Sequence, residues 1–282
     1  MNTTFGIVGH PVTHSLSPVM HNAAIQHLGL DADYQLFDID PQDPEALANF
    51  TYETDLNHIG GFSVTMPYKE VMMDYMDYYD PLAKAIGALN TVVNRNSELI
   101  GYNTDATGAL AALKEKTELP GKKALVLGAG GAARAIAYVL RESGAEVFLY
   151  NRTEAKGQAL CQALDIEWIE LASIGQAAFD LIINTTPVGS HAESAESGAS
   201  HSIITAEAIA PHAVVMDIIT QPLETPFIHE AKKAGAIAIT GERMLLHQAI
   251  GQFELWFPHA KAPVQIMEEA LYAALSSTSS ID

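Results

Sequence analysis

The residues with the clearest chemical potential are Gly128 and Gly130, in a turn between an apolar run and an alanine-rich segment. The run from 123 to 127 is typical of a buried parallel strand, and the segment from 131 to 140 is typical of a helix that follows it. Glycines in such a turn let the backbone approach a pyrophosphate, and the helix N-terminus offers free N–H groups to the anion. The pattern, completed by Ala133, predicts a dinucleotide site, although glycine-rich turns also arise for structural reasons alone.

Two cations follow the next expected strand, which runs from 146 to 150. Arg152 lies about 20 residues after the glycine turn, where a dinucleotide fold binds the adenosine ribose, and Lys156 lies one turn further on. An NAD site usually has Asp or Glu here, whereas two cations suit a ribose 2′-phosphate. We therefore predict NADP(H) as the cofactor; the alternative is that both are ordinary surface side chains.

A lysine and an aspartate with the capacity for acid–base chemistry lie earlier in the chain. Lys69 follows an expected strand from 62 to 66 and opens an expected helix, while Asp105 precedes an expected helix from 106 to 116. A lysine at such a junction is usually exposed, and an aspartate there is often only the helix N-cap. Taken alone, the residues leave the structural and the catalytic interpretation open for both.

Two hydroxyls near the N-terminus allow a similar pair of interpretations. Ser15 and Ser17 are two residues apart, so an extended segment would turn both toward a ligand carboxylate. Ser17 before Pro18 is also a good helix N-cap, which is the simpler interpretation.

Small polar residues end the apolar run from 179 to 184. They are Thr185 and Thr186, at the place where a nicotinamide ring would lie.

The elements that must position these residues alternate between strand and helix, which indicates an α/β fold. Strands are expected at 4–8, 34–38, 62–66, 123–127, 146–150, 179–184, 214–219 and 236–239, with a two-stranded connection near 87–94 and 100–105. Helices are expected at 45–52, 106–116, 131–140, 154–164, 225–234, 244–258 and 264–275, and residues 190–202 are expected to form a mobile loop.

Composition restricts the functional classes. A net charge of −19 argues against binding to nucleic acid or to an anionic membrane. The single cysteine, Cys161, excludes an internal disulfide, and the histidine spacing does not favour a metal site. No signal peptide or membrane-spanning run is evident, so we expect a cytoplasmic protein.

Ordered motifs extend along almost the whole chain: SLSP followed by HN, SVTMPYK, GALNT, GYNTD, GAGGAARA, NRT, NTTPVG, DIITQPLETP and a terminal G-x-x-ML-x-x-Q. With these motifs the chain resembles the shikimate dehydrogenases. The resemblance implies an α/β fold with an N-terminal substrate domain and a Rossmann-type dinucleotide domain facing each other across a cleft. It places the substrate-binding and catalytic domain at 1–105, completed by helices at 245–275, the NADP-binding domain at 106–244, and a disordered tail at 276–282.

The resemblance also implies the reaction, a reversible NADP-dependent hydride transfer between shikimate and 3-dehydroshikimate, by a monomer or a homodimer. Lys69 and Asp105 would form the catalytic pair, with the lysine stabilising the developing oxyanion and delivering the proton. The implied substrate-binding residues are Ser15, Ser17, Ser63, Thr65, Asn90, Thr220 and Gln248. The implied cofactor-binding residues are Gly128, Ala129, Gly130, Gly131, Ala132, Asn151, Arg152, Thr153, Lys156, Thr185, Thr186, Pro187, Ile218, Gly241 and Met244.

This chain departs from the family pattern at several positions. Ser63 stands where many members have Asn, Thr220 where a tyrosine is usual, and Arg243 where a second glycine is usual, and Phe257-Pro258 replaces the usual turn. These departures bear on the preferred substrate, so a quinate dehydrogenase or a dehydrogenase of another shikimate-like hydroxy acid is an alternative. A non-catalytic NADP-binding regulator is a second alternative, against which the presence of both Lys69 and Asp105 argues.

Overall fold

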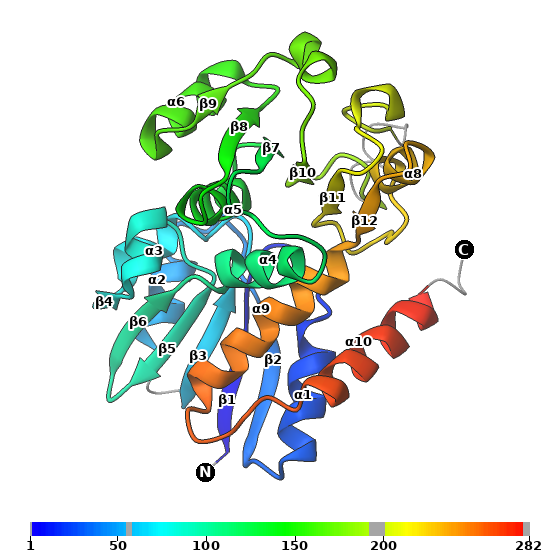
Figure 1. Ribbon diagram of the computed structural model, residues 1–282. Coiled ribbons are helices and arrows are strands. Elements are labelled where there is room, and N and C mark those ends of the chain that lie inside the picture. The colour runs from blue at the N-terminus through cyan, green and yellow to red at the C-terminus, as the bar shows by residue number, and fades with distance from the viewer. Residues whose placement is uncertain (1, 55–57, 192–200, 279–282) are drawn as a thin grey trace. The chain divides into compact units, whose positions relative to one another are not determined.

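The computed structural model describes residues 2–54, 58–191 and 201–278, which belong to two compact units (Figure 1). Unit 1 comprises Met1–Thr104 and Gln248–Asp282, and unit 2 comprises Asp105–His247. The chain leaves unit 1 at the start of α4 (Thr104–Lys114) and returns within α9 (Gly241–Trp256). The family resemblance placed the corresponding boundaries after residues 105 and 244.

Unit 1 is built on a mixed six-stranded sheet in the order β2-β1-β3-β5-β6-β4. β1 pairs in parallel with both β2 and β3, while β5 is antiparallel to β3 and β6. The strands are β1 (Thr3–Gly9), β2 (Ala32–Asp38), β3 (Ile59–Val64), β4 (Tyr78–Tyr79), β5 (Thr91–Arg95) and β6 (Glu98–Tyr102).

The two faces of this sheet carry different layers, because strand side chains alternate between faces. Phe62 and Val64 pack with Leu47 and Met72 on one face, whereas the Tyr34 ring contacts the Trp256 ring in a tilted arrangement on the other. Helices α1 and α10 pack side by side, as Figure 1 shows. The helical elements of unit 1 besides the end of α9 are α1 (Ser17–His27), α2 (Ala46–Tyr52), the 3₁₀ turn η1 (Val71–Tyr75), α3 (Pro81–Ile86) and α10 (Val264–Thr278).

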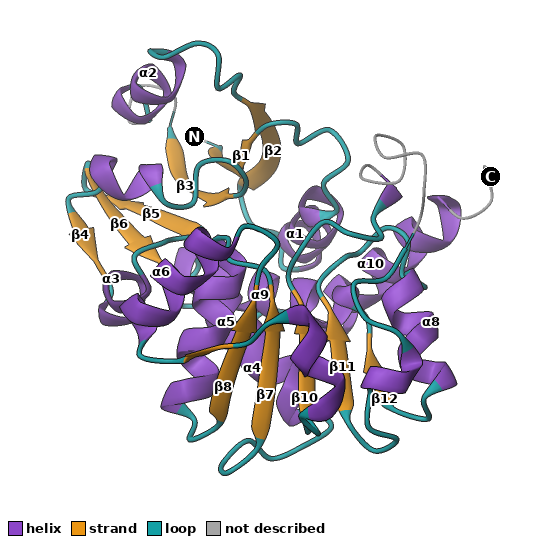
Figure 2. Cartoon of the chain, turned by 90° about the horizontal axis from the view of Figure 1, so that it is seen from above, coloured by secondary structure: helices purple, strands orange, loops and turns teal. Residues whose placement is uncertain are grey.

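Unit 2 has a six-stranded parallel sheet in the order β12-β11-β10-β7-β8-β9 (Figure 2). Val126 packs with residues of α4 and α5 on one face, and Leu125 packs with Phe227 of α8 on the other. The strands are β7 (Lys123–Leu127), β8 (Glu146–Tyr150), β9 (Glu167–Trp168), β10 (Leu181–Asn184), β11 (Val214–Asp217) and β12 (Ile237–Ile239). The helical elements are α5 (Gly131–Glu142), α6 (Glu154–Leu164), η2 (Leu171–Gln176), η3 (Ala206–Ala208) and α8 (Pro226–Lys233), with α4 and the start of α9.

The expected strands at 123–127 and 146–150 and the helix at 154–164 have the predicted bounds. The predicted disordered tail is wrong for residues 276–278, which complete α10. The hydroxyls of Ser276 and Ser277 donate to the carbonyls of Tyr272 and Ala274, which satisfies carbonyls near the helix end. Residues 279–282, and most of the expected mobile loop at 190–202, lie outside the described residues.

Within the described ranges, no helix is long and apolar enough to cross a membrane. The same ranges hold no group of three or more His, Cys, Asp or Glu side chains arranged to bind a metal ion.

Candidate active site

In unit 1, the loops after β1 and β3 leave neighbouring parallel strands at the same edge of the sheet. The Thr65 N–H donates to the Val8 carbonyl at 2.9 Å, which holds the loop after β3 against the end of β1. The Leu89 N–H donates to the Lys69 carbonyl at 2.9 Å. These backbone bonds bring the segment containing Thr65 and Lys69 next to the segment that leads into β5.

Asn90, directly before β5, lies at the centre of a buried set of hydrogen bonds and is 2% exposed. Its Oδ1 accepts from the Thr104 N–H at 2.7 Å and from the Thr91 hydroxyl at 2.9 Å. Its Nδ2 donates to Thr104 Oγ1 at 2.9 Å and to Gln248 Oε1 at 3.3 Å. Two predicted substrate residues from distant parts of the chain, Asn90 and Gln248, are therefore in direct contact.

Ser63, on the same face of the sheet as Tyr34, is 3% exposed and bonded on two sides. Its Oγ lies 2.7 Å from the Tyr34 hydroxyl and 3.0 Å from Gln252 Oε1. Burial raises the pKa of Tyr34, and the nearby hydroxyls of Ser63 and Ser17 oppose this rise. Sequence reasoning missed Gln252, although its position one helical turn after Gln248 was a signal that both amides share one face of α9.

The structure corrects two local expectations about Ser15 and Ser17. Ser17 is the first residue of α1 and not its N-cap, and the Leu16 position makes no side-chain capping bond among the described residues. The Ser15 hydroxyl instead accepts from the Ser17 N–H at 3.2 Å. Ser15 is not in an extended segment, because its own N–H donates to the Val12 carbonyl in a turn. Ser15 is half-buried and Ser17 is 3% exposed.

Lys69 and Asp105 also differ from their expected local settings. Lys69 is half-buried in a loop and does not open an α-helix, since the next helical element is η1, from Val71. Asp105 is 5% exposed and lies in the first turn of α4, so it is not the N-cap. The helix starts two residues earlier than the expected start at 106, because the Asn90 side chain already accepts the Thr104 N–H.

In unit 2, the turn between β7 and α5 has the geometry of an anion cradle. Gly128 has a φ of 116°, and a Cβ there would lie 2.5 Å from Thr185 Oγ1, so a side chain would be strained and crowded. Around Gly130, no described atom lies within 4 Å of the place of a Cβ. Gly130 is the N-cap of α5 and provides no side-chain cap. The first N–H groups of α5 therefore stay available to a ligand, which fits a pyrophosphate between residues 128 and 132.

The predicted ribose-binding segment follows β8. Asn151 is half-buried and its Nδ2 donates to the Thr153 carbonyl at 2.8 Å, which shapes the turn before α6. Arg152 and Lys156 are exposed, and neither pairs with an acidic side chain in the described part of the chain. In a chain with a net charge of −19, two unpaired cations at one turn fit a ribose 2′-phosphate.

A buried carboxylate organises the remaining predicted cofactor segments. Asp217, at the end of β11, is 0% exposed and accepts from Asn184 Nδ2 at 3.1 Å and from the Thr225 hydroxyl at 2.7 Å. Asn184 Oδ1 accepts from the Thr186 hydroxyl at 2.7 Å. Burial raises the pKa of Asp217 to about 6, against the opposing effect of its hydrogen-bond donors. Sequence reasoning did not assign Asp217 a role, although an acidic residue inside a buried apolar run was a signal.

The other predicted positions in unit 2 are also located. Thr185 donates its hydroxyl to the Leu127 carbonyl at 2.7 Å, and Pro187 is exposed. Gly241 begins α9, and a Cβ there would meet the carbonyl groups of Ile218 and Ile219. The predicted residues Ala129 and Met244 are buried, whereas Gly131, Ala132, Ile218 and Thr220 are half-buried.

Arg243, the departure from the usual glycine, is engaged by another side chain. Its Nη2 lies 2.7 Å from Glu115 Oε1, and His247 Nε2 lies 2.7 Å from the same oxygen. These contacts join α9 to the residue that directly follows α4, inside unit 2. The pKa of Glu115 is lowered, because hydrogen bonds from Arg243 and His247 outweigh the opposing effect of burial.

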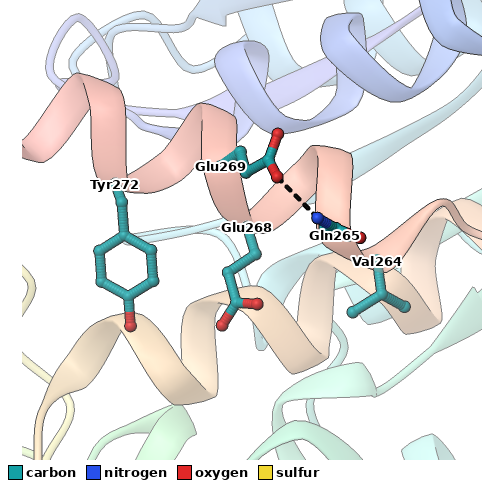
Figure 3. Close-up of a pocket in the computed structure, with 5 residues that line it drawn as sticks. All are labelled: Val264, Gln265, Glu268, Glu269 and Tyr272. Atoms are coloured by element: carbon teal, nitrogen blue, oxygen red, sulfur yellow. Dashed lines mark hydrogen bonds between the residues drawn. The ribbon is translucent and has the colours of Figure 1, made fainter.

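Two surface hollows contain none of the predicted site residues. One, of about 760 Å³, lies along α10, where Glu268, Glu269 and Tyr272 project from one helix and Gln265 Nε2 donates to Glu269 at 2.9 Å (Figure 3). The other, of about 310 Å³, lies near the start of β1 beside Trp256. The first hollow is acidic and would repel an anionic dinucleotide.

Comparisons with known proteins agree over most of the chain. The family model described as the shikimate dehydrogenase substrate binding domain matches residues 7–92. The model described as shikimate / quinate 5-dehydrogenase matches residues 110–222, and that of the shikimate 5'-dehydrogenase C-terminal domain matches residues 241–272.

Individual relatives are similar over nearly their full length. The shikimate dehydrogenase (NADP(+)) of Syntrophobacter fumaroxidans is 39% identical over 282 residues, covering 96% of this chain and 94% of the relative. That of Bacillus cereus strain G9842 is 40% identical over 265 residues, covering 91% and 93%. The crystal structure of shikimate 5-dehydrogenase from Thermus thermophilus in complex with NADP(H) and shikimate has a TM-score of 0.87 and 38% identity, covering 97% of this chain and 100% of that one.

Proposed function

The chain belongs to the shikimate dehydrogenase family, and on that premise we propose that it catalyses the reversible NADP-dependent reduction of 3-dehydroshikimate to shikimate. The observation that carries this proposal is the match to NADP(+)-dependent relatives over 96% of the chain. The shikimate- and NADP-bound relative supports the same pair of ligands. This reaction belongs to the biosynthesis of chorismate and the aromatic amino acids.

We propose that Lys69 and Asp105 form the catalytic pair. When a ketone is reduced, negative charge develops on its oxygen, and a protonated Lys69 within hydrogen-bond reach would stabilise that charge and donate the proton. Asp105, at 5% exposure, would orient the ammonium group.

NADPH supplies the hydride when it is bound. We propose that the backbone of residues 128–132 holds its pyrophosphate and that Arg152 and Lys156 hold the 2′-phosphate, with Asn151 and Thr153 shaping that turn. The remaining proposed contacts, near the nicotinamide, come from Thr185, Thr186, Pro187, Ile218, Gly241 and Met244. Asp217 would act on these residues indirectly, by holding Asn184 and through it Thr186.

For the substrate, we propose that Ser15 and Ser17 bind the carboxylate through neutral donors, which orient it without a tight ion pair. Asn90, Gln248 and Thr65 would bind ring hydroxyls. The contact between Asn90 and Gln248 supports a shared role for these two. Ser63 and Thr220 complete the proposed set; Thr220, in place of the usual tyrosine, leaves space that favours quinate as an alternative substrate.

The corresponding assignment of domains is also a proposal. Residues 1–105 with helices at 245–275 would form the substrate domain, and residues 106–244 the NADP domain. We further propose a cytoplasmic enzyme, since NADPH-dependent biosynthesis takes place there and burial keeps the only thiol unreactive by raising the pKa of Cys161 to about 11. Its oligomeric state would be a monomer or a homodimer.

The test is a set of initial-rate measurements with NADP⁺ and NAD⁺, each with shikimate and quinate, for the wild type and Lys69→Ala. We expect rapid NADP⁺ reduction with shikimate that is lost in Lys69→Ala while NADP⁺ still binds. A preference for quinate would support the alternative substrate. Cofactor binding without turnover of either acid would contradict the proposal and indicate a regulator.

A further inference from the structure

Gln252 is a buried amide that the proposed reaction does not use. It is 1% exposed on α9, and its two ends contact different segments of unit 1. Nε2 donates to the Asn90 carbonyl at 3.2 Å. Oε1 lies 3.0 Å from Ser63 Oγ and 3.4 Å from His21 Nε2. The amide therefore connects two proposed substrate residues.

The contact with Asn90 determines which way the Gln252 amide faces. A carbonyl oxygen has only lone pairs, so the group that faces it must be the amide nitrogen. The Asn90 carbonyl also accepts from the Val64 N–H at 2.8 Å, which confirms that it acts as an acceptor. A reversed amide would place two acceptor oxygens against each other in a buried site, which is unfavourable.

This orientation assigns the neighbouring protons. Gln252 Oε1 can only accept, so Ser63 must donate its hydroxyl proton to it and His21 must carry its proton on Nε2. His21 Nδ1 is then a bare acceptor, buried and without a partner among the described residues. Burial lowers the pKa of His21 to about 3, in agreement with a neutral ring.

Ser63 has only one proton, and Gln252 accepts it. The Tyr34 hydroxyl, 2.7 Å from Ser63 Oγ, must therefore donate to Ser63. After these two bonds, Ser63 has one remaining lone pair and no proton for another partner. Toward any further group Ser63 is a hydrogen-bond acceptor alone.

We propose that Gln252 is a specificity-determining positioning residue, which makes Ser63 an acceptor toward the substrate and so selects a ring hydroxyl over a group that cannot donate. The inference rests on the proposed function, in which Ser63 faces the substrate ring. A hydroxyl at that ring position donates a hydrogen bond to Ser63. A fluorine there has no proton to donate, so its lone pairs face the lone pair of the Ser63 oxygen, which is unfavourable. A buried polar group without its partner costs binding energy, so such an analogue is rejected.

The test compares shikimate analogues at C4 and C5, the ring hydroxyls that do not react. For each position, kcat/KM is measured with the deoxy and the fluoro-deoxy compound. In the wild type, we expect the fluoro compound to be the poorer substrate at the position that meets Ser63. In Gln252→Leu, the Ser63 hydroxyl no longer donates to residue 252 and can turn its proton toward the fluorine. The ratio of kcat/KM for the fluoro compound to kcat/KM for the deoxy compound should therefore rise by about tenfold. Inductive effects of fluorine on the reaction cancel between the two enzymes.

Two further variants keep the proposal testable. Tyr34→Phe leaves the Ser63 proton on Gln252, so its fluoro-to-deoxy ratio should remain that of the wild type. In Gln252→Glu, a protonated carboxyl copies the amide by donating to the Asn90 carbonyl and accepting from Ser63. As pH rises and the carboxyl ionises, an acceptor faces that carbonyl, so kcat/KM relative to wild type should fall with pH. His21 and Tyr34 are the titratable side chains that the described network brings to this position.

The outcomes separate the two levels of the argument. Two outcomes would overturn the role of Gln252 alone, provided that the wild type turns over shikimate. One is a fluoro-to-deoxy ratio of kcat/KM that is the same in Gln252→Leu and the wild type. The other is a kcat/KM of Gln252→Glu, relative to wild type, that does not vary with pH. If Gln252→Leu fails to fold, the pH profile of Gln252→Glu decides. No turnover of shikimate by the wild type would overturn the proposed function and this inference with it.

Discussion

Asn90 in unit 1 is 2% exposed with its amide bonded at both ends, whereas Arg152 in unit 2 is exposed and pairs with no acidic side chain among the described residues. The same contrast holds for their neighbours. Ser63 and Gln248 are buried at 3% and 7%, whereas Lys156 is exposed and the start of α5 has no side-chain cap.

The contrast indicates that the two ligands are recognised by different physics. Buried, mutually bonded side chains hold fixed donors and acceptors, and such groups discriminate strongly between ligands that do and do not complete their hydrogen bonds. Exposed cations and backbone N–H groups attract an anion of the right charge and are screened by salt. Unit 1 is therefore expected to determine substrate identity, and unit 2 to determine cofactor affinity.

The largest expected effect is on the substrate side. Lys69→Met removes the proposed proton donor while keeping the stem length, so kcat should fall by about 10²- to 10⁴-fold. The Kd for NADP⁺, measured by calorimetry, should stay within about twofold, because the change removes no proposed cofactor contact. Lys84→Met, at an exposed lysine of α3, is the matched control. A normal kcat in Lys69→Met would exclude Lys69 as the acid.

The next largest effect is expected at Asp217, whose hydrogen bonds form a buried network in unit 2. Its pKa is raised from 3.8 to about 6, so the folded state binds this proton more tightly than the unfolded state does. The resulting contribution to the free energy of unfolding is fully present below pH 3.8 and is lost as pH rises through about 6. The total loss is about 3 kcal/mol.

Asp217→Asn removes this titration while retaining an acceptor for Asn184. We therefore compare the free energies of unfolding of Asp217→Asn and the wild type. The value for the variant minus the value for the wild type should increase by about 3 kcal/mol between pH 3.8 and a pH above about 6. Urea unfolding followed by circular dichroism at a series of pH values measures it. A difference that does not vary with pH would show that the Asp217 proton is not linked to folding.

A smaller effect is expected at the cofactor phosphate. Arg152→Gln should raise the KM for NADP⁺ by about tenfold, since a charge-assisted hydrogen bond to the 2′-phosphate is lost, and should leave the KM for NAD⁺ nearly unchanged. Lys156→Gln should have a weaker effect in the same direction. Lys114→Gln, at an exposed lysine of α4, controls for total charge. Equal effects on both cofactors would argue against 2′-phosphate recognition.

The smallest effect is expected at Glu115. Its pKa is held below the usual value by Arg243 and His247 despite partial burial, so its stabilising contribution is present at neutral pH and lost as pH falls through the lowered pKa. Glu115→Gln should lower the free energy of unfolding by about 1 kcal/mol at pH 7, with no difference in strong acid. Denaturant midpoints at the two pH values measure it. A marked change in the KM for NADP⁺ would instead connect Arg243 with the cofactor.

Local pattern was enough to predict the frame of unit 2 and the turn at Gly128. Strand β7 and strand β8 are continuous apolar runs, and a glycine turn has few alternative structures, so neighbouring residues determine the result. Local rules failed at Ser17 and Asp105, because each residue already lies inside the first turn of its helix. The Ser15 hydroxyl accepts the Ser17 N–H, and the Asn90 side chain, which is distant in sequence, accepts the Thr104 N–H.

Local pattern could place Gln252 on the face of α9 that carries Gln248, but it could not predict the hydrogen bonds that Gln252 makes. His21 and Gln252 are 231 positions apart, and Ser63 and Gln252 are 189 apart, so only the folded sheet brings them together. A buried amide on α9 resembles any other polar residue in sequence. Its role depends on its contact with the Asn90 carbonyl, which sequence spacing cannot predict.

The most direct test of the contrast between the two units is the ionic-strength dependence of the two KM values in the oxidation of shikimate by NADP⁺. We expect the KM for NADP⁺ to rise several-fold as KCl is increased, because exposed cations bind its phosphates, while the KM for shikimate changes by less than about twofold. Parallel rises in both values, or a larger rise for shikimate, would contradict the account.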